Sequence, residues 1–162
     1  MIDRDRLTPQ EHAAAAASWA RDTPVPQPPE ADRLVLLLES IRSLGAVRRQ
    51  VRAFLRAGLP DDAGDVGEDV VEHAVLVIDE LTSNALRHGL PPSRLQVCDE
   101  PDRWIVVVSD SAPERSPTPA VERPAGAGGY GLHLVADLTG AHGVHYETDQ
   151  KLVWACLEKP GR

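Results

Sequence analysis

The segment VLVIDELTSNALRHG, residues 75–89, restricts the possible folds of this chain more than any other part of its sequence. Apolar residues in and just before it recur at the spacing of a helix with one buried stripe: Val70, Ala74, Ile78, Leu81 and Ala85. Glu80, Asn84 and His88 follow one another every four residues, so they stack along one side of that helix. We therefore predict an amphipathic helix that carries a carboxylate and a carboxamide at the margin of the core.

Glu80 and Asn84 have the chemistry of a magnesium–nucleotide site. Magnesium takes oxygen ligands, often one from the protein and the rest from phosphates and water, and the amide oxygen of Asn84 fits that role. Glu80 can then orient or deprotonate an attacking nucleophile. On helix context alone, the alternative is that the two residues form a solvated helix edge.

A glycine cluster, GAGGYGL over residues 126–132, precedes a predicted helix over 131–138. Backbone amides at glycine can approach phosphate oxygens closely, and the start of a helix adds a favourable dipole. The phosphate-binding candidates are Gly126, Gly128, Gly129 and Gly131. Taken alone, such a cluster is equally typical of a flexible turn.

Other nucleotide and metal motifs fit less well. The glycines match the G-x-G-x-x-G pattern of dinucleotide-binding enzymes, but that pattern needs a strand before the first glycine, and a proline-rich stretch over 117–124 stands there instead. No Gly-Lys-Ser/Thr triplet of a P-loop occurs. His133, His142 and His145 are predicted on a helix, a turn and a strand, which disfavours a zinc site.

The composition narrows the class of partner. With 17 basic and 25 acidic residues the net charge is -8, so we expect no direct nucleic-acid partner and no membrane partner. Cys98 and Cys156 lie in apolar runs and are expected to be buried thiols in a reducing compartment, although they could meet on adjacent strands. With no apolar signal at the N-terminus, these features predict a cytoplasmic protein.

The pattern along the chain predicts one globular domain over residues 31–160, preceded by a helical arm and a proline-rich linker over 1–30. The expected helices cover 8–21, 43–57 with Ser43 as cap, the segment after an acidic loop at 61–69, and 131–138. The expected strands cover 34–38, 95–98, 104–109, 143–146 and 152–157, and a proline-rich lid covers 111–125. This order predicts an α+β fold: a two-layer sandwich with helices on one face of a mixed, mainly antiparallel sheet.

Asp110 stands where the strand over 104–109 meets the predicted lid. A carboxylate at this place can accept a hydrogen bond from an exocyclic amine, which would select adenine over guanine. The alternative is an aspartate that caps the loop ahead of Pro113.

Glu80-x-x-x-Asn84, Asp110 after a strand, and Gly129-x-Gly131-Leu132 at a helix start resemble, in this order, the GHKL ATPase superfamily, which includes gyrase, histidine kinases and heat-shock chaperones. Within this superfamily, the sequence of residues 79–89 and the segment KLVWA at 151–155 are similar to those of bacterial anti-sigma-factor serine kinases. The likeness is greatest to the stand-alone ATP-binding regulators of actinomycetes. The resemblance covers residues 34–158.

The resemblance implies a Bergerat-type ATP-binding fold with ATP and Mg²⁺ as cofactors. It makes Glu80 the catalytic base, Asn84 the magnesium ligand and Asp110 the adenine contact. The remaining expected nucleotide contacts are His88, Gly126, Gly128, Gly129, Gly131 and Leu132. One departure concerns the superfamily's Asp-x-Gly-x-Gly turn, which reads Asp-Ser-Ala-Pro-Glu from Asp110 onward and has lost both glycines.

On this basis we expect an ATP-binding anti-sigma factor and serine/threonine kinase. It would phosphorylate an anti-sigma-factor antagonist, sequester a sigma factor, and regulate transcription by partner switching, with a homodimer as a possible assembly. The alternative is a partner-switching module that holds ATP, or nothing, without transferring phosphate.

Overall fold

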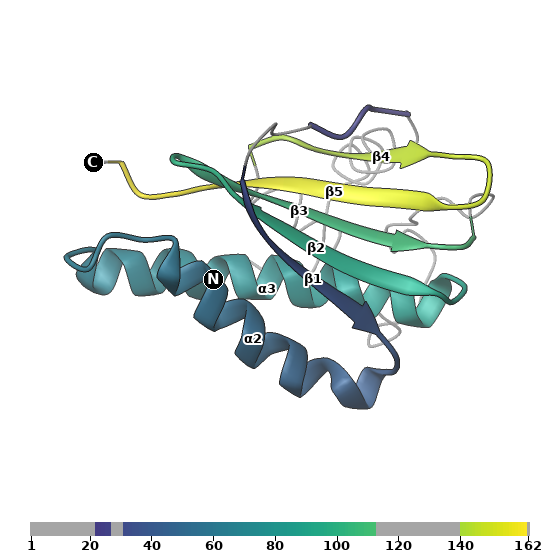
Figure 1. Ribbon diagram of the computed structural model, residues 1–162, viewed down its shortest axis with the longest axis horizontal. Helices are drawn as coiled ribbons and strands as arrows, with labels where there is room; N and C mark the ends of the chain where they lie inside the picture. Colours follow the sequence, from purple (N-terminus) through teal and green to yellow (C-terminus); the bar gives the residue numbers. More distant parts are fainter. Residues whose placement is uncertain (1–21, 27–30, 113–139, 162) are drawn as a thin grey trace, which may run out of the picture.

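The computed structural model describes residues 22–26, 31–112 and 140–161, and its main feature is an open five-stranded sheet with two helices on one face (Figure 1). The strands are β1 (Asp32–Leu38), β2 (Ser93–Asp99), β3 (Arg103–Asp110), β4 (His142–Tyr146) and β5 (Lys151–Glu158). A 3₁₀ turn (Ile41–Ser43) leads into α2 (Leu44–Ala57), and α3 (Gly64–His88) follows. The predicted α+β sandwich is confirmed.

The sheet has the order β1-β2-β3-β5-β4, and neighbouring strands pair antiparallel throughout. The one parallel contact in the described ranges is an isolated bridge between Asp22 and Val144. The predicted hairpin between β2 and β3 is present, and its turn is closed by a hydrogen bond from the Glu100 amide to the Arg103 carbonyl, at 2.9 Å. The sheet is thus almost wholly antiparallel, as the prediction allowed.

The core lies between the sheet and the helices. Every second side chain of β3 and β5 faces the helices, and Trp104, Val106, Ala155 and Val108 are almost completely buried there. The apolar stripe of α3 packs against them, with Ala74, Ile78, Leu81 and Ala85 buried and Val70 partly so. The stripe predicted from the sequence is therefore the one that contacts the core.

One helix boundary and one helix cap differ from the prediction. Residues 64–69, expected within an acidic loop, form the first turns of α3, because Asp65 favours the positive end of the helix dipole and Glu68 forms an ion pair with Arg56. Ser43 precedes α2 as expected, but its side chain makes no cap hydrogen bond to the helix. Its hydroxyl instead donates to the Ser40 carbonyl at 2.6 Å.

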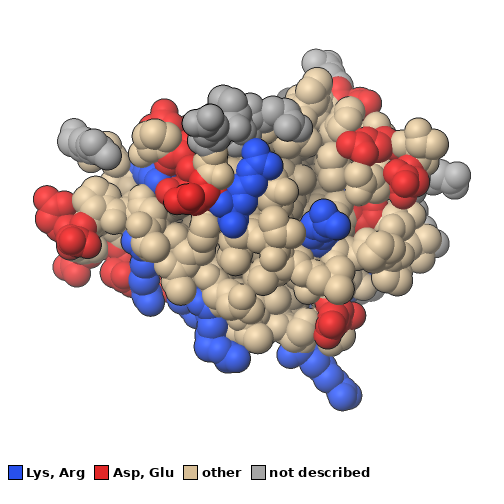
Figure 2. Space-filling view, viewed as in Figure 1, with Lys and Arg blue, Asp and Glu red and all other residues tan. Residues whose placement is uncertain are grey.

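Three ion pairs join α2 to α3: Arg48–Asp79, Arg52–Glu72 and Arg56–Glu68, at 2.7, 2.9 and 2.9 Å. The arginines recur every four residues, so they line the side of α2 that faces α3. Figure 2 shows basic side chains along the lower edge of the molecule, where α2 lies, and acidic ones at the end formed by the α2–α3 turn. Exposed pairs of this kind each add little stability, but together they fix the relative position of the two helices.

The face of the sheet away from the helices carries a second apolar cluster: Cys98, Ile105, Trp154 and Cys156, with Val25, Ala31 and Val107 packed on it. Cys98 and Cys156 are both buried and free, and both pair in register with Ile105 of the strand between them. Two strand spacings separate them by about 9–10 Å, which is beyond the reach of a disulfide. The prediction that the cysteines are buried thiols is confirmed, while a meeting on adjacent strands is not what the fold produces.

Residues 22–26, predicted as part of an extended linker, lie against β4 and β5. The Thr23 amide donates to the Val144 carbonyl at 2.8 Å, and the Trp154 indole donates to the Thr23 carbonyl at 3.1 Å. Gly143 makes this approach possible, because a Cβ built on it would lie 3.0 Å from both the Thr23 Cβ and the Trp154 ring.

The predicted helices over 8–21 and 131–138, and the lid beyond residue 112, lie outside the described residues. No helix in the described ranges combines the length and the apolarity needed to cross a membrane.

Candidate functional site

Two buried hydroxyl groups of α3 donate hydrogen bonds to carbonyls of the same helix. The Thr82 hydroxyl donates to the Ile78 carbonyl at 2.8 Å, and the Ser83 hydroxyl donates to the Glu80 carbonyl at 3.3 Å. These bonds let two polar residues turn toward packed surroundings without an unpaired donor. Glu80 and Asn84 then occupy the partly exposed margin next to the buried stripe, as the spacing predicted.

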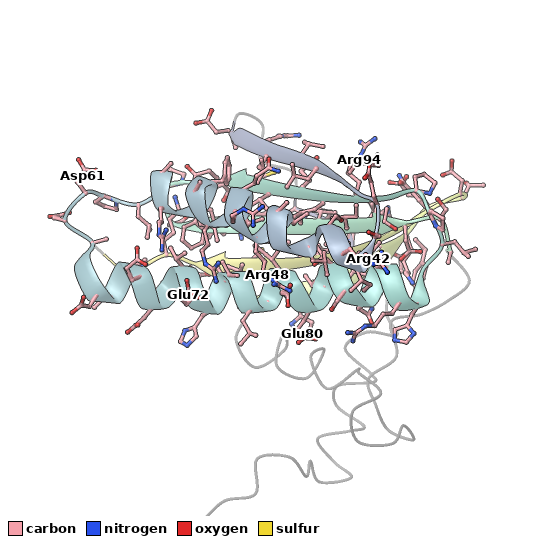
Figure 3. The ribbon with its side chains drawn as sticks, turned by 90° about the horizontal axis from the view of Figure 1, so that it is seen from below. Arg42, Arg48, Asp61, Glu72, Glu80 and Arg94 are labelled. Carbon is pink, nitrogen blue, oxygen red and sulfur yellow. The ribbon has the colours of Figure 1, made fainter. Side chains whose placement is uncertain are left out.

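Glu80 is a partly buried carboxyl with a perturbed acidity. Figure 3 shows its side chain on the side of α3 away from α2, whereas Arg48 lies between the two helices. Desolvation by burial raises the pKa of Glu80, the neighbouring Asp79 raises it further, and Arg87 opposes the shift. A carboxylate with a raised pKa is a stronger proton acceptor, as a general base requires.

The Asn84 side chain lies one helical turn after Glu80 and is partly exposed. No hydrogen bond of this side chain is found within the part of the chain that the structure describes, so no described residue competes for its amide oxygen. No group of three or more histidine, cysteine, aspartate or glutamate side chains able to hold a metal occurs among the described residues. Among the described residues, a cation at Asn84 would thus have few protein ligands, and phosphates and water usually supply the others for Mg²⁺.

Asp110 ends β3 and is only 2% exposed. Its Oδ1 accepts a hydrogen bond from the Ala112 amide at 2.8 Å, and its Oδ2 lies 3.5 Å from the Nζ of Lys151. Asp110 therefore caps the following loop, which was the alternative considered for it. A carboxylate has about four lone-pair positions, so these two contacts leave room for a further donor.

Gly89 joins the end of α3 to Asp110. A Cβ built on Gly89 would lie 2.6 Å from the Asp110 Cγ and 2.6 Å from the Ala85 carbonyl oxygen, so only glycine permits this packing. The Ser111 amide also donates to the Leu90 carbonyl at 2.8 Å, which fixes the loop after α3 to the end of β3. At 1.5 Å of rise per residue, Glu80 lies about 13 Å along α3 from this junction. The site is thus elongated, with Asp110 at one end and Glu80 at the other.

A family model for the histidine kinase-like ATPase domain matches residues 37–157, which is most of the chain. The chain belongs to the histidine kinase-like ATPase family. No match was found among curated proteins. Family membership agrees with the α+β sandwich and supports ATP binding by this domain.

In this member of the histidine kinase-like ATPase family, the sequence did not predict that Lys151 is buried beside Asp110. It faces the helix side of the sheet with Val153 and Ala155, and it is directly opposite Asp110 in the pairing of β3 with β5. A buried lysine is rare unless it is paired, but only the strand register reveals which carboxylate it meets. The one signal in the sequence was a charged residue within an alternating apolar run.

The remaining predicted site residues divide into two groups. His88 is the last residue of α3 and is partly exposed beside Gly89. The phosphate-binding candidates Gly126, Gly128, Gly129 and Gly131 and the expected nucleotide contact Leu132 lie outside the described residues, so their roles stay predictions.

Proposed function

We propose that this protein is an ATP-binding anti-sigma factor that phosphorylates a serine or threonine of an anti-sigma-factor antagonist. The observation that carries the proposal is the pairing, on one partly exposed face of α3, of a carboxyl with raised pKa and an amide oxygen one turn later. In a family of ATP-binding domains, that pair has the chemistry of proton removal and magnesium coordination. The partner class is inferred from the likeness of residues 79–89 and 151–155 to anti-sigma-factor kinases.

The described residues fit a magnesium–nucleotide complex by their donor chemistry. Asn84 offers an oxygen ligand with no competing hydrogen bond in the described ranges, and Asp110 retains acceptor capacity for an amine. Gly89 lets the end of α3 approach Asp110 without a side chain between them. ATP supplies the phosphoryl group when bound, and Mg²⁺ neutralises charge on its phosphates.

Glu80 would act on the protein substrate. Desolvation favours the protonated form of its carboxyl, so it would accept the proton of the antagonist's hydroxyl as that oxygen bonds to the γ-phosphorus of ATP. The bond from this phosphorus to the β-phosphate oxygen would break in the same transfer, and ADP would leave. Asn84 would hold the metal one helical turn away, and the helix between them is rigid because Leu81 and Ala85 are packed in the core. Catalysis on this scheme is chiefly positioning.

Glu80→Gln tests the kinase proposal, because it keeps the size and hydrogen bonding of the side chain but removes the base. ATP binding should survive, while transfer of labelled phosphate to a co-purified antagonist should fall by about 10²-fold or more. Glu72→Gln is the matched control, since Glu72 lies on the same helix and its carboxylate pairs with Arg52 instead. Equal transfer by wild type and Glu80→Gln would contradict the role of Glu80.

A second candidate is a partner-switching module that binds ATP or a regulatory protein without catalysis. The observation that favours it is the state of Asp110, whose carboxylate already contacts Lys151 and the Ala112 amide in a turn without glycines. The two candidates differ in one measurement. If wild type holds a sigma factor yet transfers no phosphate to any antagonist that it binds, the binding module is the correct function.

A further inference from the structure

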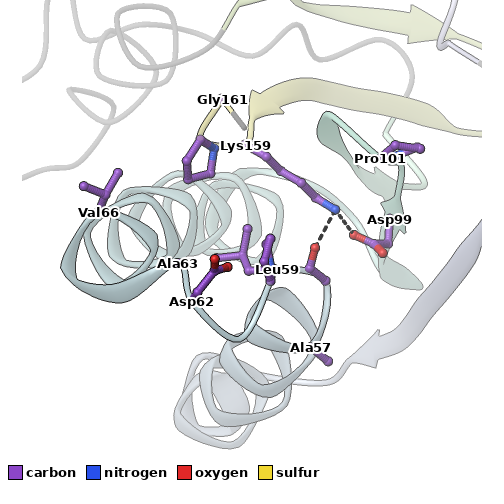
Figure 4. Close-up of a pocket in the computed structure, with 12 residues that line it drawn as sticks. Ala57, Leu59, Asp62, Ala63, Val66, Asp99, Pro101, Lys159 and Gly161 are labelled. Carbon is purple, nitrogen blue, oxygen red and sulfur yellow. Dashed lines mark hydrogen bonds and ion pairs between the residues drawn. The ribbon is translucent and has the colours of Figure 1, made fainter.

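Two hollows of the described surface differ in the charge that they offer a ligand. At the α2–α3 turn, a pocket of about 890 Å³ is lined by apolar residues together with Asp62, Asp99 and Lys159 (Figure 4). Lys159 is the one cation among the described residues that line it, and its Nζ already donates to the Gly58 carbonyl at 2.8 Å and to Asp99 Oδ1 at 2.6 Å. Because this ammonium is held by structural partners, the pocket is not suited to an anion.

A smaller groove of about 250 Å³ lies on the face of the sheet away from the helices. Arg94 lies four residues before Cys98 on β2, so it faces the same side of the sheet as the second apolar cluster. Arg33 and Arg94 both line this groove, and Val107 and Leu152 form apolar parts of its wall. No carboxylate is found among its described lining residues, although the whole chain has a net charge of -8. The groove is therefore a positively charged, partly apolar site in an acidic protein.

Arg94 and Ser109 place two kinds of donor side by side in this groove. They are directly opposite each other in the pairing of β2 with β3, where Cβ atoms lie about 4.5–5.5 Å apart. Neither side chain makes a hydrogen bond or ion pair within the described ranges, and Figure 3 shows Arg94 on the side of the sheet away from α3. Arg33 already interacts with another group, so it adds positive charge to the groove rather than a free donor. A guanidinium and a hydroxyl are thus available to one anionic group.

Apolar side chains flank the two donors on both sides. Leu37 is opposite Arg94 on β1 and is 61% exposed, while Leu152 is opposite Ser109 on β5. A guanidinium binds a carboxylate through two parallel N–H···O bonds, and a hydroxyl adds a third donor. A small inorganic anion would leave the apolar walls of the groove without contacts, whereas an acid with a hydrocarbon part would cover them.

We propose that this groove binds the carboxylate of an apolar organic acid. Arg94 donates two hydrogen bonds to the carboxylate, Ser109 donates a third, and the hydrocarbon lies on Val107 and Leu152. The site is separate from the proposed nucleotide site, because Asp110 follows Ser109 on β3 and therefore faces the helix side of the sheet with Val108. The inference does not depend on ATP binding. Either a free acid or the C-terminal carboxylate of a partner protein with an apolar last residue offers this chemistry.

The test is an NMR titration of the full chain with hexanoate and with its neutral analogue hexanamide. Hexanoate should shift the backbone amide signals of residues 94–97 and 107–109 and reach saturation, and hexanamide should bind about tenfold or more weakly. Arg94→Met should weaken hexanoate binding by about tenfold or more, and Ser109→Ala by less. Arg94→Lys keeps the charge but not the two-pronged geometry, so its affinity should be intermediate. Arg49→Met, which removes an exposed arginine of α2, is the matched control for net charge and should bind hexanoate as wild type does.

A second arm distinguishes the two sources of the carboxylate. Acetyl-alanyl-leucine with a free C-terminus and the same dipeptide with an amidated C-terminus are titrated in the same way. Tighter binding of the free-carboxylate dipeptide than of hexanoate would support a partner's C-terminus, and the reverse order would support a free acid. Because Arg94 is exposed, its substitution should leave the other amide signals unchanged, which confirms that the variant is folded. Equal binding of hexanoate and hexanamide, wild-type affinity in Arg94→Met, or no binding of either carboxylate would overturn the proposal.

Discussion

Gly89→Ala is the sharpest test of the junction between α3 and Asp110. The added methyl would lie 2.6 Å from the Ala85 carbonyl oxygen and 2.6 Å from the Asp110 Cγ, so helix end and strand end must move apart. Overpacking by one methyl group costs about 1–3 kcal/mol. The φ of -86° is open to alanine, so no backbone strain is added, and the smaller entropy of the unfolded chain offsets about 0.4–1 kcal/mol. The net loss should be about 1–2 kcal/mol.

For a chain of this size, such a loss lowers the Tm by about 2–8 °C. Urea unfolding and thermal melting would measure it, and ATP affinity should fall in the same variant because Asp110 is displaced. Gly45→Ala is the matched control: it lies in α2 with nothing within 4 Å of the added Cβ. Alanine there should raise stability by about 0.5–1 kcal/mol. A Gly89→Ala protein that melts at or above the wild-type temperature would show that Gly89 does not pack on Asp110 as described.

Three further predictions concern the site. Asn84→Ala should abolish the magnesium-dependent part of ATP affinity and leave the fold intact. Calorimetry with and without Mg²⁺ measures this affinity. If wild type binds ATP equally well with and without Mg²⁺, the prediction is contradicted. In Asp110→Asn the side-chain amide can both donate and accept hydrogen bonds, so the preference for ATP over GTP should be lost. The change in relative affinity should be a few kcal/mol at most in competition binding. If wild type binds ATP and GTP with equal affinity, Asp110 is not part of the site. The folded-state pKa of Glu80 is raised, so wild-type stability falls as pH rises through it. Glu80→Gln should therefore be relatively more stable at pH 7 than at about pH 4 in urea unfolding, and a pH-independent difference would exclude desolvation as the cause.

The sequence predicted the elements whose signals are local. The stripe of α3 and the alternation in β3 depend on residues within one segment, and the structure confirmed both. The predicted start of α3 was wrong because the first turns of this helix are stabilised by partners on another helix, such as Arg56 for Glu68. A pattern read along one segment contains no information about such partners.

The candidate site shows the same division. Glu80 and Asn84 were found because helical spacing alone places them together. Lys151 was missed because its meeting with Asp110 depends on the register of β3 with β5, two strands separated by a long stretch of chain. The contact of Gly89 with Asp110 was also beyond reach, since it depends on how closely a helix end approaches a strand end.

The attachment of residues 22–26 has a practical consequence for truncated versions of the protein. A version that begins at the predicted domain start, residue 31, would remove the chain from the Val144 carbonyl and leave the Trp154 indole without its acceptor. It would also remove the one bridge that the described residues place beside β4, the last strand of the sheet, and an unpaired strand edge can pair with other molecules. Retaining the chain from Asp22 onward keeps these contacts with β4 and Trp154, so the boundary suited to expression lies before the proline-rich linker rather than after it.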